Sequence, residues 1–242
     1  MKIIAMVPAR MGSKRVPKKN IRYLGDKPLI THCIDAIKES NCFDEIYINS
    51  EDDIFKSICN NYGIKFYHRP EVHASDTATN DDFVSDFLSN IECDILIQIL
   101  PTSPFITSDE IKCFVNEMKA TRCNTLVSVK NIQISCLWNP DKNKNIPINF
   151  DPQKELPPSQ DMIPISAYAT SLMGWKSSVF IDNITKYGCA YHGPDGNTEY
   201  FELKGYSTVD IDNEEDFLLA EAIYKINKNR IAPKYYGTDS NE

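Results

Sequence analysis

The sequence predicts an α/β protein whose mainly parallel mixed sheet is covered by helices on both faces. Strand and helix patterns alternate through the first 130 residues of the 242-residue chain. Several strand-like runs are continuously apolar, which is typical of strands buried on both faces of a sheet. Two polar segments, PARMGSKR and LPTSPF, directly follow such runs. Ligands of these sheets bind at the carboxyl ends of the strands, so a site is expected where the two segments meet.

Each predicted element of the first half depends on its own local pattern. Strands are expected where short runs are apolar or rich in β-branched residues, namely at 2–8, 45–50, 64–68, 94–99 and 125–130. Helices are expected where apolar residues recur at helical spacing, namely at 28–39, 52–62, 80–90 and 107–119. Pro28 suits the first position of its helix, Gly63 ends the second, and Asn80 is expected to cap the third. Thr107 and Glu110 form a capping pattern for the fourth.

The alternating pattern stops after Lys130. Residues 139–164 contain six prolines and little periodicity, so we expect either a mobile surface excursion or an arm that packs on a partner subunit. Strand-like sequence returns at 167–175 and 198–204, and 207–228 predicts a strand, a turn and a helix capped by Asn213.

The predicted organisation is one discontinuous domain with an insertion. Residues 1–130 and 165–230 are expected to form the domain, 131–164 a proline-rich arm for dimerisation, and 231–242 a poorly ordered tail. No internal repeat or second autonomous domain is predicted.

Composition argues against several functional classes. The formal net charge of −8 disfavours a dedicated nucleic-acid or membrane-surface protein. No apolar run approaches the ~20 residues of a transmembrane helix, and the opening MKIIAMV is too short for a signal sequence. The eight cysteines show no C-x-x-C pair, so reduced thiols and a cytoplasmic location are expected, although an even count would also permit four disulfides. Four lie in apolar stretches and are expected in the core: Cys33, Cys59, Cys93 and Cys113.

A basic loop follows the first predicted strand. Five cations lie within ten residues: Arg10, Lys14, Arg15, Lys18 and Lys19. Gly12 and Ser13 permit close approach of the backbone, and converging cations with main-chain N–H groups suit a polyphosphate. The loop matches neither the Walker A nor the dinucleotide glycine pattern. A solvated turn is the alternative, and five cations in an acidic protein make it the weaker one.

Two aspartates near the carboxyl terminus form a second candidate site. Asp210 and Asp212 alternate on a predicted extended run, which places both carboxylates on one face. Like charges roughly 7 Å apart repel each other unless they face solvent or hold a cation. Mg²⁺ would satisfy both and bridge to phosphate oxygens, whereas the alternative is a pair of caps for the next helix. A cationic loop combined with paired aspartates is typical of nucleotidyl transfer.

A third polar segment, residues 68–83, precedes a predicted helix. Its side chains could hydrogen-bond a base or a ribose, although such residues also populate ordinary loops: Arg69, Ser75, Asp76, Thr77, Thr79 and Asn80. No Ser-His-Asp or Cys-His arrangement is evident at local spacing, which gives hydrolase chemistry little support.

The segment PARMGSKRVPKKN resembles the signature of the CMP-acylneuraminate synthetases, cytidylyltransferases that activate sialic acids and related nonulosonates. That signature pairs Ala-Arg with Ser-Lys and Pro-x-Lys-Asn. Similar blocks follow in the same order, namely RPEVHASDTATNDD, LPTSPF and DIDNEEDFLLAE. The resemblance spans residues 3–130 and 207–225.

The resemblance implies a Rossmann-like fold of the nucleotide-diphospho-sugar transferase type. It also implies a Mg²⁺-dependent reaction in which CTP and a 2-keto-3-deoxy sugar acid give a CMP-sugar and diphosphate, for surface glycan synthesis. The partners would be CTP, the sugar acid and a second copy of the chain, without nucleic acid or membrane, and the proline-rich segment would pack across that homodimer.

Residue roles carry over by position. The catalytic set would be Arg10, Lys14, Lys19 and Asp212, with Asp210 and Asp212 as metal ligands. The nucleotide-binding set would be Ala9, Arg10, Gly12, Ser13, Lys14, Lys19, Asn20, Arg69, Ala78 and Asn80. The residues expected to face the sugar are Leu100, Thr102, Ser103, Ser159, Gln160 and Asp161.

The chain also departs from the family pattern where the sugar would bind. Leu100 replaces the glutamine of a Gln-Pro-Thr-Ser-Pro block, and PISAYATSLMGW replaces an Arg-Pro-Asn-Gly-Ala block. Loss of an arginine removes a bidentate clamp, which argues against N-acetylneuraminate as the acceptor. The segment PPSQDMIPISAYAT resembles the pseudaminate and legionaminate branch of the family, and the sequence does not identify the sugar acid. Two alternatives remain: a nucleotidyltransferase with another acceptor, such as a sugar phosphate, and an inactive nucleotide-binding module.

Overall fold

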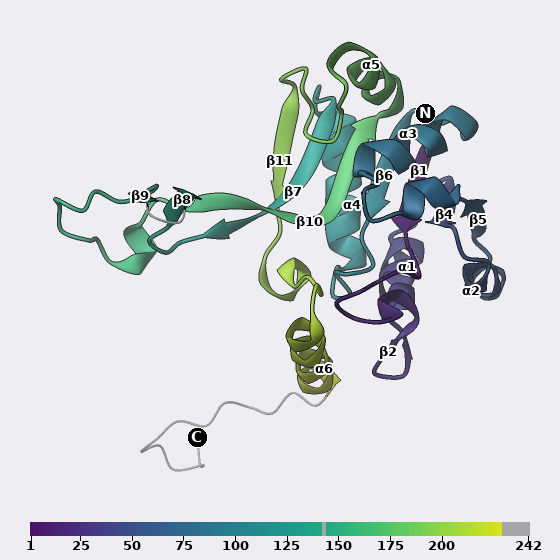
Figure 1. Ribbon diagram of the computed structural model, residues 1–242, viewed down its shortest axis with the longest axis horizontal. Coiled ribbons are helices and arrows are strands. Elements are labelled where there is room, and N and C mark those ends of the chain that lie inside the picture. The colour runs from purple at the N-terminus through teal and green to yellow at the C-terminus, as the bar shows by residue number, and fades with distance from the viewer. Residues whose placement is uncertain (142–143, 229–242) are drawn as a thin grey trace.

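A seven-stranded sheet forms the centre of the computed structural model, which describes residues 1–141 and 144–228 (Figure 1). The strand order is β11-β7-β10-β6-β1-β4-β5. The strands are β1 (Ile3–Pro8), β4 (Glu45–Ser50), β5 (Lys65–His68), β6 (Ile95–Ile99), β7 (Thr125–Ile132), β10 (Ile165–Lys176) and β11 (Thr198–Glu202). Only β10 runs antiparallel to its neighbours in this sheet, which confirms the mainly parallel mixed sheet.

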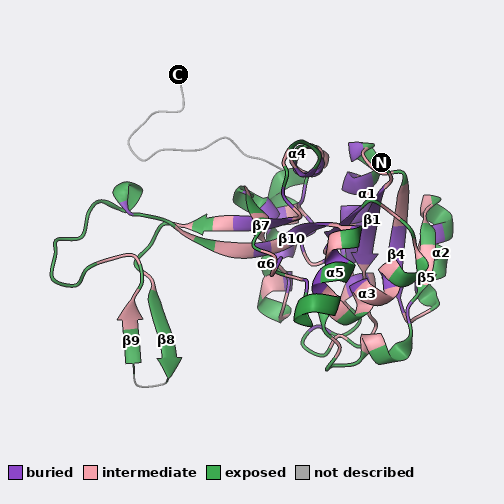
Figure 2. Ribbon diagram, turned by 90° about the horizontal axis from the view of Figure 1, so that it is seen from above, coloured by how far each residue is buried: buried purple, intermediate pink, exposed green. Residues whose placement is uncertain are grey.

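Helices cover both faces of the sheet (Figure 2). They are α1 (Leu29–Ser40), α2 (Ile54–Tyr62), α3 (Asn80–Asn90), α4 (Ser108–Ala120), α5 (Ser177–Tyr187) and α6 (Glu214–Lys228). Helices α1 and α4 contact each other on one face, and α3 and α5 contact each other on the other. Each face has its own apolar cluster, because the central strands are buried from both sides.

The predicted elements of the first half are confirmed to within two residues at each end. One cap is corrected. Thr79, and not Asn80, caps α3: its Oγ1 accepts a hydrogen bond from the Asp82 amide while the Asp82 carboxylate accepts one from the Thr79 amide. The predicted capping pair of Thr107 and Glu110 is present at α4.

The second half differs more from the prediction. Helix α5 was not expected, and residues 209–212 belong to no strand, although Val209 has an extended backbone. A short 3-10 turn, Gly205–Thr208, replaces the start of the expected strand. The predicted cap of α6 is confirmed, because the Asp216 amide donates to Oδ1 of Asn213 at 2.9 Å.

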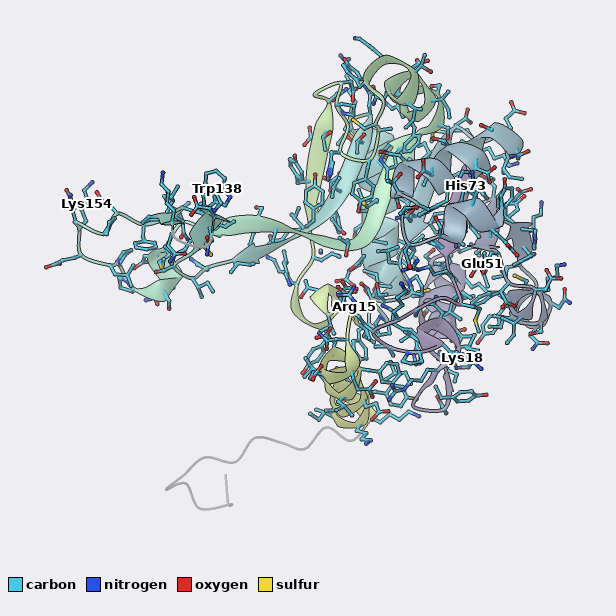
Figure 3. The ribbon with its side chains drawn as sticks, viewed as in Figure 1. Arg15, Lys18, Glu51, His73, Trp138 and Lys154 are labelled. Carbon is cyan, nitrogen blue, oxygen red and sulfur yellow. The ribbon has the colours of Figure 1, made fainter. Side chains whose placement is uncertain are left out.

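Residues 131–141 and 144–164 form an arm that projects away from the sheet (Figures 1 and 2). It begins on the extended ends of β7 and β10 and carries a hairpin of β8 (Leu137–Asp141) and β9 (Lys144–Pro147). Asn149 ties its base together, because Nδ2 donates to the carbonyls of Ile134 and Ile163 at 2.8 and 2.9 Å. Trp138 and Lys154 both lie on this arm, far from the helices (Figure 3).

Two further expectations concern thiols and membranes. All eight cysteines are free. Cys113 faces solvent and Cys93 is only half-buried, so the core position predicted for these two cysteines is wrong.

Within residues 1–141 and 144–228, no helix has both the length and the hydropathy needed to span a membrane. The tail predicted at 231–242 lies outside the described residues.

Candidate active site

A cavity of about 270 Å³ lies at the carboxyl ends of β1 and β6. The basic loop after β1, the turn after β6 and the segment before α6 meet there. Ten of the residues predicted for the site line the cavity: Ala9, Arg10, Ser13, Lys14, Lys19, Asn20, Arg69, Leu100, Thr102 and Asp212. The parallel pairing of β1 and β6 brings the basic loop and the turn after β6 together. The acidic segment joins them because the Ile211 amide donates to the Thr102 carbonyl at 2.9 Å.

Several predicted residues lie outside the lining. Ser103 is fully buried, and its Oγ accepts a hydrogen bond from Ser171 Oγ at 2.9 Å, so it supports the turn after β6. Ser159, Gln160 and Asp161 form a 3-10 turn on the arm, where Gln133 Nε2 donates to the Gln160 carbonyl. Gly12, Ala78, Asn80 and Asp210 are also outside the lining. A Cβ added to Gly12 would meet no atom within 4 Å, so this glycine is not required by protein packing.

Lys19 is the most buried cation of the basic loop, with a side chain 13 % exposed. Its Nζ donates to the Ile211 carbonyl at 2.5 Å and lies 3.9 Å from Oδ1 of Asp212. Burial lowers the pKa of Lys19, and attraction to Asp212 and Asp210 offsets part of that effect. Lys19 therefore joins the basic loop directly to the acidic segment.

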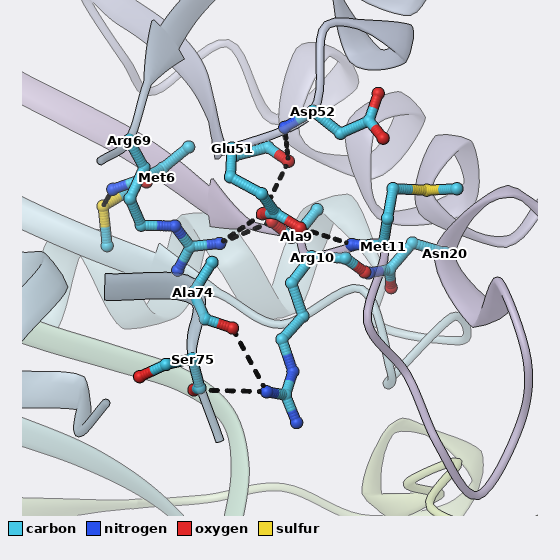
Figure 4. A network of polar contacts seen from close by, with 12 residues as sticks. Met6, Ala9, Arg10, Met11, Asn20, Glu51, Asp52, Arg69, Ala74 and Ser75 are labelled. Carbon is cyan, nitrogen blue, oxygen red and sulfur yellow. Dashed lines mark hydrogen bonds and ion pairs between the residues drawn. The ribbon is translucent and has the colours of Figure 1, made fainter. Parts of the chain in front are cut away.

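Arg10 and Lys14 both pair with Asp76, which lies outside the cavity lining. Arg10 Nη1 lies 3.3 Å from Oδ1 of Asp76, and Lys14 Nζ lies 2.5 Å from Oδ2 of the same carboxylate. Arg10 Nη1 also approaches the carbonyls of Ala74 and Ser75 at 3.4 Å (Figure 4).

A buried ion pair between Glu51 and Arg69 fixes the start of the basic loop (Figure 4). Arg69 Nη2 donates to the Ala9 carbonyl at 2.5 Å and lies 3.6 Å from Oε2 of Glu51, whose Oε1 accepts from the Met11 amide at 2.8 Å. The guanidinium stacks 4.9 Å from the Phe83 ring centroid. Burial lowers the pKa of Arg69, and Glu51 partly offsets this effect. Glu51 was missed by the sequence analysis, and its place directly after a buried strand was the available signal.

Asn20 holds the other side of the basic loop. Its Nδ2 donates to the Arg10 carbonyl at 3.2 Å, and its Oδ1 is buried without a hydrogen-bond partner. Arg69 Nε is likewise buried and unpartnered, as is Nδ2 of Asn80, which lies outside the lining. Buried polar atoms are normally paired, so two such atoms on lining residues indicate a polar ligand.

The two aspartates flank a core residue. Ile211 between them is fully buried with residues of α1 and α6, whereas Asp210 and Asp212 are part-exposed, and of these two only Asp212 lines the cavity. Oδ1 of Asp210 is a buried oxygen without a partner. Burial raises the pKa of Asp210, and repulsion from Asp212 adds to the increase.

The aspartate pair fits a divalent cation. An orphaned carboxylate oxygen with a raised pKa gains most from a positive charge beside it. Among the described residues no group of three or more His, Cys, Asp or Glu side chains could hold a metal. Two carboxylates with water and phosphate oxygens are nevertheless the usual ligand set of Mg²⁺.

The two cations without a predicted role differ in the structure. Arg15 lines the cavity, and its Nη2 contacts Oδ1 of Asp212 at 3.0 Å. Lys18 is exposed and has a left-handed backbone with φ of 54°, so it shapes the turn before Lys19.

Comparisons with known proteins agree with this geometry. A family model described as cytidylyltransferase matches residues 4–188. An N-acylneuraminate cytidylyltransferase of Streptococcus agalactiae is 29% identical over 224 residues, which is 90% of this chain and 52% of that protein. The chain thus spans about half the length of that relative. A CMP-N,N'-diacetyllegionaminic acid synthase of Legionella pneumophila is 35% identical over 144 residues, which is 57% of this chain and 62% of that protein.

Solved structures share the fold. A CMP:2-keto-3-deoxy-manno-octonic acid synthetase complexed with CTP matches with a TM-score of 0.71 and covers 94% of this chain and 100% of its own. Its sequence identity is 14%, so this likeness concerns the fold alone.

Proposed function

The chain belongs to the cytidylyltransferase family, and on that premise we propose that it transfers the cytidylyl group of CTP to a nonulosonic sugar acid. One observation carries this proposal: three cations, Arg10, Lys14 and Lys19, line the same cavity as the carboxylate of Asp212. Nucleotidyl transfer requires cationic side chains that bind the triphosphate and carboxylates that bind a metal ion. The product would be an activated sugar donor for surface glycan synthesis.

The nucleotide would satisfy the unpaired polar atoms around the cavity. Asn20 Oδ1 and Arg69 Nε supply one acceptor and one donor for cytosine and ribose, and Asn80 Nδ2, from outside the lining, would be a second donor. Ser13 and Ala78 complete the nucleoside side in this proposal. The phosphates extend toward the cations of the basic loop, where main-chain N–H groups add to the positive potential.

The chemistry is an in-line attack by the anomeric hydroxyl of the sugar acid on the α-phosphate. A new P–O bond forms as the bond to the bridging oxygen breaks, diphosphate leaves with its charge held by Arg10, Lys14 and Lys19, and the hydroxyl proton passes to solvent. Mg²⁺ held by Asp210 and Asp212 would polarise the α-phosphate and lower the pKa of the attacking hydroxyl. Lys19 is already desolvated, so its charge acts in a medium of low dielectric constant.

The acceptor side of the cavity favours a less polar sugar acid than N-acetylneuraminate. Leu100, Val16 and Pro101 give the lining an aliphatic wall where an amide would offer hydrogen bonds. A polar sugar substituent facing this wall would lose its hydration without compensation. We therefore propose a legionaminate- or pseudaminate-type acid, in line with the name of the Legionella relative.

We infer that the protein acts as a homodimer through its arm. Six large apolar side chains of the arm are each at least half exposed: Ile134, Leu137, Trp138, Ile148, Leu156 and Ile163. Such a concentration of exposed apolar surface marks an interaction site. Ser159, Gln160 and Asp161 would contact the sugar in the cavity of the second copy, since they do not line their own.

A substrate screen tests the proposed function. CTP, UTP, ATP and GTP are each combined with Mg²⁺ and a panel of acceptors, and diphosphate release is measured. The panel contains N-acetylneuraminate, legionaminate, pseudaminate, a 2-keto-3-deoxy-octonic acid and a sugar phosphate. We expect diphosphate release when CTP is combined with legionaminate or pseudaminate. Release with a sugar phosphate alone would identify the alternative acceptor, and CTP binding without release would identify an inactive module. Lys19→Met should abolish the activity, and Lys56→Met, a change of the same kind on α2, should not.

A further inference from the structure

A carboxylate of the protein bridges two of the cations proposed to bind the triphosphate. Oδ1 of Asp76 contacts Arg10 at 3.3 Å and Oδ2 contacts Lys14 at 2.5 Å, so each carboxylate oxygen holds one cation. Two oxygens of a phosphate group would make the same pair of contacts. Attraction to Lys14, and less strongly to Arg10, lowers the pKa of Asp76, which therefore carries its full charge at neutral pH.

The loop that carries Asp76 is held in place by contacts with Arg10, which belongs to the basic loop. Asp76 follows the 3-10 turn Glu71–Ala74 and precedes the Thr79 cap of α3. Arg10 Nη1 reaches the Ala74 and Ser75 carbonyls as well as Asp76 (Figure 4). The hydrogen bonds between residues 75 and 78 of this loop are long. Ser75 Oγ lies 3.2 Å from Thr77 Oγ1, and the Ala78 amide donates to the Ser75 carbonyl at 3.3 Å.

The ion pairs of Asp76 are weak enough to be exchanged. The side chains of Asp76, Arg10 and Lys14 are 51, 40 and 75 % exposed. Exposed pairs contribute little to stability and are screened by salt. A polyphosphate carries more charge than one carboxylate, so it would win the competition for both cations.

We propose that Asp76 is an internal anion that pairs with the phosphate-binding cations before a nucleoside triphosphate binds, leaves them when the triphosphate binds, and returns when diphosphate departs. The inference rests on the proposed function, because it takes the β- and γ-phosphates to be the groups held by Arg10 and Lys14. Lys19 pairs with the acidic segment, with its Nζ 3.9 Å from Oδ1 of Asp212, so its contact with the diphosphate does not involve Asp76.

Two consequences follow for the ligands of the reaction. A ligand with a diphosphate group must displace Asp76, so Asp76 weakens the binding of CTP and of inorganic diphosphate. CMP lacks those phosphates and leaves Asp76 in place, so its affinity does not depend on this residue. Asp76 therefore favours release of diphosphate over its rebinding.

Affinities of a neutral variant test the proposal. Asp76→Asn keeps the shape of the side chain and removes its charge, and Glu71→Gln removes one charge from the same loop at an exposed position outside the cavity lining. Calorimetric titrations with CTP, inorganic diphosphate and CMP are made in the presence of Mg²⁺. We expect Asp76→Asn to bind CTP and diphosphate about two- to tenfold more tightly, with CMP unchanged and Glu71→Gln close to wild type. Equal tightening in both variants, or weaker CTP binding by Asp76→Asn, would overturn the proposal.

Zero-length cross-linking measures the exchange in the wild-type protein. A carbodiimide activates the Asp76 carboxylate, Lys14 Nζ attacks it, and an amide bond forms as the urea departs. We expect CTP to suppress this cross-link severalfold and CMP to leave it, while the exposed Lys56–Asp53 pair on α2, 2.8 Å apart, reacts as before.

The cross-link also separates the two proposals. CTP that binds by calorimetry and leaves the Lys14–Asp76 yield unchanged would overturn this inference alone. CTP that does not bind to the wild-type protein would overturn the proposed function, and the inference with it.

Discussion

Arg15 Nη2 lies 3.0 Å from Oδ1 of Asp212, although 197 positions of sequence separate the two residues. One of the two carboxylates proposed to hold Mg²⁺ is therefore paired with an arginine of the basic loop. Since Arg15 is 68 % exposed, this pair is weak and open to exchange.

Arg15 and a metal ion compete for Asp212, so removing the arginine should favour the metal. We expect Arg15→Gln to lower the Mg²⁺ concentration for half-maximal activity by about two- to fivefold, which is the range of an exposed ion pair. Mn²⁺ binding followed by electron paramagnetic resonance provides a reading independent of turnover. Lys18→Gln removes a neighbouring charge from outside the cavity lining and should leave both values unchanged. If Arg15→Gln binds the metal more weakly than the wild type, Arg15 supports metal binding, and the proposed competition for Asp212 is contradicted.

Glu51 is the counter-ion of a buried arginine, so its charge matters for stability and for the shape of the basic loop. In Glu51→Gln the Arg69 guanidinium, 4 % exposed, loses its ion pair, which should lower the free energy of unfolding by about 1–3 kcal/mol. CTP affinity should fall as well, because Glu51 also holds the Met11 amide. Denaturant unfolding and calorimetry measure the two effects. Asp53→Asn on the exposed side of α2 is the control, and equal losses in both variants would contradict this role.

The raised pKa of Asp210 predicts a pH-dependent cost of folding in the absence of metal. The folded protein binds this proton more tightly than the unfolded chain does, so stability falls as pH rises from the ordinary carboxyl pKa through the raised folded pKa. Asp210→Asn should remove that decline while abolishing activity. Mg²⁺ with CTP should raise the melting temperature of the wild type more than that of Asp210→Asn. Melting curves between pH 4 and pH 8 test both points, and an unchanged pH dependence in the variant would refute them.

The exposed apolar arm predicts a dimer that a single charge can disrupt. Ile163 is 75 % exposed, so Ile163→Asp should convert the protein to a folded monomer. Ile226→Asp on α6, at a side chain 56 % exposed, should leave the dimer intact. Light scattering after size-exclusion chromatography measures both masses. A monomeric wild type would refute the role given to the arm.

Local patterns in the sequence were sufficient to predict the sheet and most of the cavity. The basic loop and LPTSPF follow neighbouring buried strands, and the carboxyl ends of parallel strands necessarily meet. Helix α5 was missed because Val179, Ile181 and Ile184 have modest helix propensity, and its stability comes from packing against α3 and β10. The pairings of Arg15, Glu51 and Asp76 join distant segments, so no local pattern could reveal them.

The position of the bond that breaks tests the central claim most directly. CTP labelled at the α- or the γ-phosphate is incubated with Mg²⁺ and the best nonulosonate of the panel, and the products are separated. Cytidylyl transfer predicts that the α-label appears in the CMP-sugar and the γ-label in diphosphate, with neither formed by Lys19→Met. A γ-label on the sugar acid, or both labels retained in CTP for every acid of the panel, would contradict the account.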